Sequence, residues 1–205
     1  PPKATGMTVT SSEAFIVCTD DLATKDGAGY SSTMQLNVQL EFPEGVVKKN
    51  LQTDSRTSYS VPDDSPFSVD ENGKVTANSK GTVGEENITV SFEGQDVSQV
   101  FLVQVTKFES LKVTASPEPT YSGSASVDAS TLSPIACSIP TLYQQATVRV
   151  QLLLGNGEGK DLAVEVTSFS IEIVEGDTAV VKESSRVLSA SGIGKVAIIA
   201  TFAET

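Results

Sequence analysis

Apolar and polar residues alternate with a period of two in ten runs along the chain, from MTVT at 7–10 to KVAIIATF at 195–202. Such a period places every second side chain on one face, as in a β-strand with one face in a core. No window carries an apolar stripe at helical spacing over three turns. Turn signals such as GNGEGK at 155–160 separate the runs. The pattern predicts an all-β chain of short strands, typical of sandwiches.

One turn signal is specific enough to predict a hairpin. In DENGK at 70–74, we expect Asn72 and Gly73 to adopt the positive φ angles that a tight turn between two strands needs.

The two halves of the chain resemble each other. NVQLEF at 37–42 aligns with RVQLLL at 149–154, and TSYSV at 57–61 aligns with TSFSI at 167–171. We therefore predict two copies of one unit, residues 1–108 and residues 109–205.

The junction between the copies, TKFES, holds neither Pro nor Gly. We expect a stiff connection in which the last strand of the first copy runs almost directly into the second. The second copy lacks a counterpart of the Val-rich closing strand at 100–105. Either that strand lies outside this segment, or another subunit donates it to an open sheet edge.

The string FSVDENGKVTANSKGTVGEENITVSFEG at 67–94 resembles the bacterial immunoglobulin-like (Big) domain family, second group. The positions of the first copy that match the family pattern are Leu36, Val38, Val69, Gly73, Val75, Gly81, Ile88 and Val90. In the second copy Ser185 replaces the hairpin Gly, while Val150, Val187, Gly194 and Ile198 remain. The resemblance implies two tandem immunoglobulin-like β-sandwiches that serve as spacers or adhesive modules rather than as enzymes.

Composition and charge exclude several classes of function. The 205 residues carry a net charge of −12, which repels nucleic acid and anionic membranes. Without a single His, the chain has no imidazole base and no His-ligated metal site. No stretch of about 18 apolar residues predicts a membrane span. We therefore expect a non-enzymatic protein that is not inserted in a membrane and needs no cofactor.

Acidic pairs are the remaining candidates for site chemistry. They lie at Asp20 and Asp21, Asp63 and Asp64, Asp70 and Glu71, and Glu85 and Glu86. Ca²⁺ binding is the alternative for these oxygens, although none follows the spacing of a calcium loop. An acid and base pair of an enzyme is a further alternative, but acidic pairs in loops are usually solvated turns, and we favour that interpretation.

Each copy contains one cysteine, Cys18 and Cys137. The two form a disulfide with each other, pair with cysteines outside this segment, or stay reduced as small buried side chains. An extracellular location favours oxidation.

Two further features are candidates for modification and contact. Asn87 begins the single N-x-[ST] sequon, a candidate for N-glycosylation in a eukaryotic secretory pathway. The long polar loops at 18–32 and 116–134 precede the same strand in each copy, with Tyr30 and Tyr121 as candidate exposed anchors for a partner.

Together these features predict a mature segment of a larger extracellular or cell-surface protein that acts as a rigid spacer and protein–protein contact. Its expected partners are other domains of the same chain, other surface proteins or further copies of itself. One alternative is a subunit of an extracellular filament, assembled by strand complementation or disulfides. The other is a Ca²⁺- or carbohydrate-binding accessory module, and the absence of Trp disfavours its carbohydrate-binding form.

Overall fold

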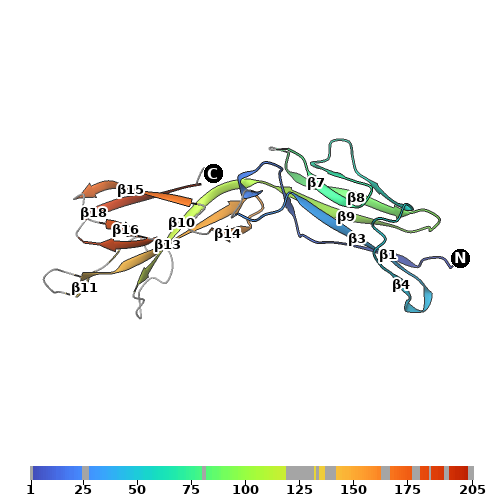
Figure 1. The fold of residues 1–205 in the computed structure, drawn as a ribbon, viewed down its shortest axis with the longest axis horizontal. Coiled ribbons are helices and arrows are strands. Elements are labelled where there is room, and N and C mark those ends of the chain that lie inside the picture. The colour runs from blue at the N-terminus through green and yellow to red at the C-terminus, as the bar shows by residue number, and fades with distance from the viewer. Residues whose placement is uncertain are drawn as a thin grey trace. The chain divides into compact units, whose positions relative to one another are not determined.

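A computed structural model describes residues 2–24, 28–79, 82–118, 132, 134–136, 142–162, 167–176, 181–184, 186–191 and 194–202. These residues form the β-strands seen in Figure 1. Turns and two short 3₁₀ helices, η1 (Leu22–Thr24) and η2 (Pro43–Gly45), join them. The prediction of an all-β chain is confirmed. No helix in the described part of the chain has the length and apolar character of a membrane span.

The chain divides into two compact units that are described separately. Unit 1 comprises Pro1–Lys25, Gly29–Phe108 and Leu154–Asn156, and unit 2 comprises Asp26–Ala28, Glu109–Leu153 and Gly157–Thr205.

Unit 1 contains two sheets. The five-stranded sheet has the order β1-β3-β7-β6, with β4 paired to β3. Its strands are β1 (Gly6–Ser11), β3 (Thr33–Glu41), β4 (Val47–Lys48), β6 (Phe67–Val69) and β7 (Lys74–Ala77). The four-stranded sheet has the order β2-β9-β8-β5. Its strands are β2 (Ile16–Val17), β5 (Thr57–Ser60), β8 (Gly84–Phe92) and β9 (Ser98–Thr106).

The core of unit 1 follows from the alternation in its strands. On β3 every second side chain is buried, and these are Met34, Leu36, Val38 and Leu40. They belong to one cluster with Ile88 and Val90 of β8 and Val103 of β9. Both sheets therefore contribute to one core, in which each fully buried Val or Leu stabilises the unit by about 1.5–3 kcal/mol.

Unit 2 repeats the order of the larger sheet. Its five-stranded sheet runs β10-β13-β17-β16, with β14 paired to β13. The strands are β10 (Phe108–Glu118), β13 (Gln145–Leu154), β14 (Gly159–Asp161), β16 (Val181–Ser184) and β17 (Val187–Ala190). Two pairs accompany it, β11 (Pro134–Ala136) with β12 (Leu142–Tyr143), and β15 (Thr167–Gly176) with β18 (Gly194–Phe202).

The two units also share strand register. Thr57 of β5 pairs with Phe92 of β8, and Thr167 of β15 pairs with Phe202 of β18, so both partners are shifted by 110 residues. Equivalent sequence positions therefore occupy equivalent places in the strand pairs of the two units.

The DENGK segment forms the predicted hairpin, between β6 and β7. Gly73 has φ +73°, whereas Asn72 is not among the residues with positive φ. The prediction of two positive φ angles is therefore wrong for Asn72. Both the Asn72 and the Lys74 backbone N–H groups donate to Asp70 Oδ1 (2.9 and 2.8 Å), so a side chain completes the turn and one glycine suffices.

Lys107 is the single residue between β9 and β10. The chain thus passes from the last strand of unit 1 to the first of unit 2 without a loop, as the sequence of the junction predicted.

Candidate functional site

Asp20 and Asp21, the first acidic pair, differ in their burial. Asp21 is 3% exposed, and its Oδ1 accepts hydrogen bonds from the backbone N–H groups of Ala23 (2.9 Å) and Phe108 (3.0 Å). Asp20 is exposed and has φ +62°. The buried carboxylate therefore holds η1 and Phe108, the first residue of β10, in place.

The remaining acidic pairs give no chelating geometry. Asp70 completes the β6–β7 turn, and Glu85 Oε1 accepts a hydrogen bond from Gln104 Nε2 (2.8 Å). Asp63 and Asp64 are both exposed. In the part of the chain that the structure describes, no group of three or more His, Cys, Asp or Glu side chains is placed to hold a metal ion.

Two ion pairs occupy further acidic side chains of unit 1. Arg56 Nη2 donates to Asp54 Oδ2 at 2.7 Å. Hydrogen bonds from the Arg56 side chain and backbone hold the pKa of the Asp54 carboxyl well below its usual range. Lys3 Nζ lies 2.7 Å from Asp96 Oδ2, and the hydrogen bond with Lys3 lowers the pKa of Asp96 in the same way. The Lys3–Asp96 pair is exposed to solvent, and in the other pair Arg56 is exposed while the Asp54 side chain is 22% exposed. Ion pairs at the surface contribute little stability.

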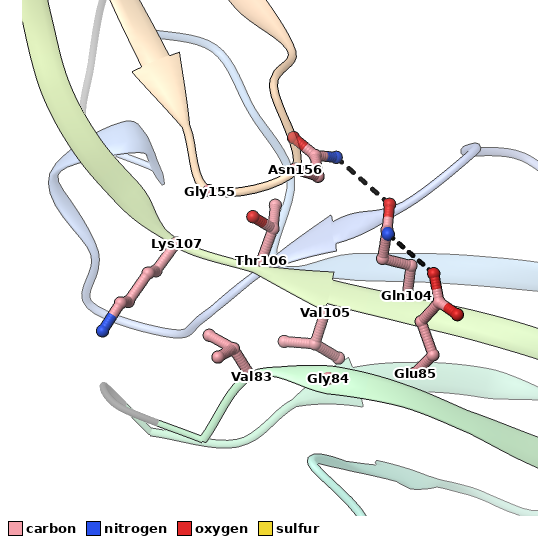
Figure 2. A pocket seen from close by; sticks show the side chains of 9 residues that line it. All are labelled: Val83, Gly84, Glu85, Gln104, Val105, Thr106, Lys107, Gly155 and Asn156. Carbon is pink, nitrogen blue, oxygen red and sulfur yellow. Dashed lines mark hydrogen bonds between the residues drawn. The ribbon is translucent and has the colours of Figure 1, made fainter.

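A shallow hollow of about 220 Å³ lies in unit 1 where β8 begins and β9 ends (Figure 2). Gln104 stands between Glu85 and Asn156 in a chain of hydrogen bonds, accepting from Asn156 Nδ2 at 3.1 Å. The Gly155 N–H donates to the carbonyl of Lys107 at 3.0 Å. Ligand pockets typically have about 300–1,000 Å³, so this hollow is smaller than a typical ligand pocket, and its polar side chains bond one another.

Cys18 is completely buried in the core of unit 1 and is a free thiol. Its Sγ lies 3.5 Å from the carbonyl oxygen of Thr82. This placement matches the third of the three alternatives, a small buried side chain. Cys137 lies outside the described residues, so a pairing that involves it stays a prediction.

Asn87 is exposed on the outer face of the four-stranded sheet, where it pairs in register with Leu102 of β9. The sequon is thus sterically open at its Asn side chain, and its glycosylation stays a prediction.

The same face carries apolar side chains that the sequence analysis missed. Val100 is 55% exposed and Leu102 is 54% exposed. We call this surface the β8–β9 face, defined by Glu85, Asn87, Thr89, Val100, Leu102 and Gln104. The signal lay in VFLV at 100–103, where apolar residues occupy both faces of the strand instead of alternating.

Tyr30 is only partly exposed, which contradicts the prediction of an exposed anchor. Its ring centroid lies 5.8 Å from that of Phe15, and its N–H donates to the carbonyl of Ala23 at 3.2 Å. Packing against a neighbouring ring explains the partial burial. Tyr121 lies outside the described residues, and its role as an anchor stays a prediction.

A second exposed surface, also missed, is the segment 43–50 between β3 and β5, which we call the arm (Figure 1, around β4). All of its residues are exposed, including Val46 at 59% and Val47 at 44%. A hollow of about 540 Å³ lies between the arm and the side chains of Pro2 and Phe42. The sequence signal was VVKK at 46–49, two apolar residues beside the only adjacent basic pair of an acidic chain.

Comparisons with known proteins add a likeness in fold. No family model matches the chain, so the Big domain family remains a resemblance. No curated protein matches it either. Among solved structures, it is similar to domains 1–6 of the surface layer protein SbsC, with 14% identity and a TM-score of 0.50 over 99% of this chain. The match spans 27% of that chain, and at this identity it concerns the fold alone.

Proposed function

We propose that this chain is a non-enzymatic structural and adhesive module of a larger extracellular or cell-surface protein, in which it acts as a rigid spacer and a protein–protein contact. The observation that carries the proposal is the direct passage from β9 to β10, with Lys107 as the single residue between these strands, in a chain whose two units share the order of their five-stranded sheets. A chain without a loop at this point has few backbone dihedrals about which the units can turn.

The use of polar side chains in unit 1 supports a non-enzymatic role. Asp21 binds two backbone N–H groups, and the Thr57 hydroxyl donates to the carbonyl of Leu51 at 2.6 Å. Both side chains are buried and serve the fold itself. The similarity in fold to domains of a surface layer protein supports, by analogy only, a location at the cell surface.

The stiffness of the junction can be tested by measuring distances between spin labels. Labels at Asp64→Cys and Asp161→Cys, two exposed positions in different units, are introduced in a Cys137→Ser chain, where buried Cys18 resists labelling. We expect a narrow distance distribution that broadens severalfold when Gly-Ser-Gly-Ser is inserted after Lys107.

A matched pair of labels inside unit 1, at Asp64→Cys and Ser98→Cys, gives the width contributed by the labels themselves. A wild-type junction as broad as the inserted one would overturn the spacer function.

One observation favours the filament alternative as a second candidate. In unit 1, β8 pairs with both β5 and β9, whereas its counterpart β18 pairs with β15 alone among the described strands of unit 2. Strand complementation at β18 predicts oligomers that persist when unit 1 surfaces are altered, which distinguishes it from the assembly contact argued next.

A further inference from the structure

The arm differs in charge from the rest of unit 1. Lys48 and Lys49 outweigh Glu44 within residues 43–50, while the chain as a whole carries a charge of −12. All three side chains are exposed. The arm is therefore a basic projection from an acidic protein, and its electrostatic attraction is toward acidic surfaces.

The backbone presents the arm in a defined shape. Leu40 and Glu41 of β3 pair with Lys48 and Val47 of β4, and the N–H of Phe42 donates to the carbonyl of Val46 at 2.8 Å. A paired hairpin loses less conformational entropy on binding than a flexible loop does, so its exposed valines are prepared for a contact.

The β8–β9 face has the complementary character. Its outward side chains include Val100 and Leu102, each more than half exposed, and the carboxylate of Glu85. None of its six defining residues is basic. Both surfaces thus expose two large apolar side chains. Those of the arm lie beside basic residues, and those of the β8–β9 face share that face with an acidic residue.

We propose that the arm of one copy of this chain docks on the β8–β9 face of a second copy. Val46 and Val47 pack against Val100 and Leu102, while Lys48 and Lys49 face Glu85. The two surfaces differ, so the contact is heterologous and adds copies in an open series. The arm has only eight residues, so the contact is smaller than a stable interface of 1,200–2,000 Å² and the association is weak and concentration-dependent.

This inference rests on the proposed function in that it assigns the contact surface of the module. It is tested by self-association, whereas the spacer role is tested by label distances within one chain, so either can fail alone.

The test is sedimentation velocity of the 205-residue chain with reductant, over concentrations from tens to hundreds of micromolar. We expect reversible self-association that Lys48→Glu/Lys49→Glu and, separately, Glu85→Lys weaken at least tenfold. Mixing these two variants restores association, because the acidic arm of one then meets the basic face of the other.

The matched control is Lys74→Glu/Lys112→Glu, which makes the same change in charge at two exposed lysines outside both surfaces. It leaves association within about twofold of the wild-type value. An uncharged pair, Val100→Ser/Leu102→Ser, weakens association as the arm variant does.

A wild-type chain that stays monomeric at the highest concentration would overturn the proposal. So would an arm variant that associates normally, or a mixture of the two charge variants that fails to associate. Loss with the arm variant but not with the β8–β9 face variants means that the arm binds another surface, which also overturns it.

Discussion

At the scale of single residues, burial changes the acidity of the Tyr59 hydroxyl in unit 1. Its hydroxyl donates to the carbonyl of Gln52 at 2.9 Å. Burial, with a smaller contribution from the charge of Asp70, raises the pKa of Tyr59 to about 12. The ordinary tyrosine value is about 10, so the folded state disfavours the phenolate.

We therefore expect ionisation of the Tyr59 hydroxyl to lower the stability of the fold at alkaline pH. Because the folded pKa lies above the unfolded one, the contribution is complete below about pH 10 and is lost as the pH rises toward about 12. Tyr59→Phe lowers the free energy of unfolding at neutral pH by about 1 kcal/mol through the lost hydrogen bond. In urea titrations, this deficit shrinks at about pH 11; an unchanged deficit would contradict the prediction.

At the scale of elements, hairpins depend on a few backbone positions. In the β6–β7 turn, a Cβ on Gly73 would lie 2.5 Å from Tyr59 Oη, and the backbone there has φ +73°. Gly73 thus meets two requirements, the left-handed backbone of the turn and the close approach of the Tyr59 side chain from β5.

Gly73→Ala is expected to destabilise the chain on both counts. The positive φ costs about 1–2 kcal/mol for a residue with a Cβ, and the contact with Tyr59 adds about 1–3 kcal/mol. Gly94→Ala is the matched control, since its φ is +77° but no atom lies within 4 Å of the added Cβ. Chemical denaturation should separate the two variants by about 1 kcal/mol or more, and equal losses would show that the Tyr59 contact is immaterial.

At the scale of the whole molecule, each unit holds its own core, and the core of unit 1 encloses Cys18. A thiol with no exposed surface reacts with a water-soluble reagent only when the surrounding structure opens.

We expect Cys18 in a Cys137→Ser chain to react with a chromogenic thiol reagent about a thousandfold or more slowly than in guanidinium, for an unfolding free energy of about 5 kcal/mol or more. Reaction at the unfolded rate under native conditions would contradict its burial. The wild-type chain without reductant tests the disulfide alternative: a Cys18–Cys137 disulfide would leave no thiol to react even after unfolding, whereas two reduced cysteines would both react.

The sequence by itself determined the all-β class, the longer strands and the β6–β7 hairpin. A strand with one buried face has a period of two, and MQLNVQLEF at 34–42 shows it in full, with β3 at Thr33–Glu41. Short strands such as β4 and β14 escaped, because two or three residues carry no period.

Only the tertiary structure decided which side chains stay exposed and can contact a partner. Tyr30 was a reasonable anchor by residue type, yet Phe15 covers part of it. Val100 and Leu102 belong to the Val-rich strand at 100–105, yet each is more than half exposed on the outer face of the four-stranded sheet. Burial depends on what lies opposite a strand in space, which residues far apart in the chain supply, so local sequence patterns do not contain it.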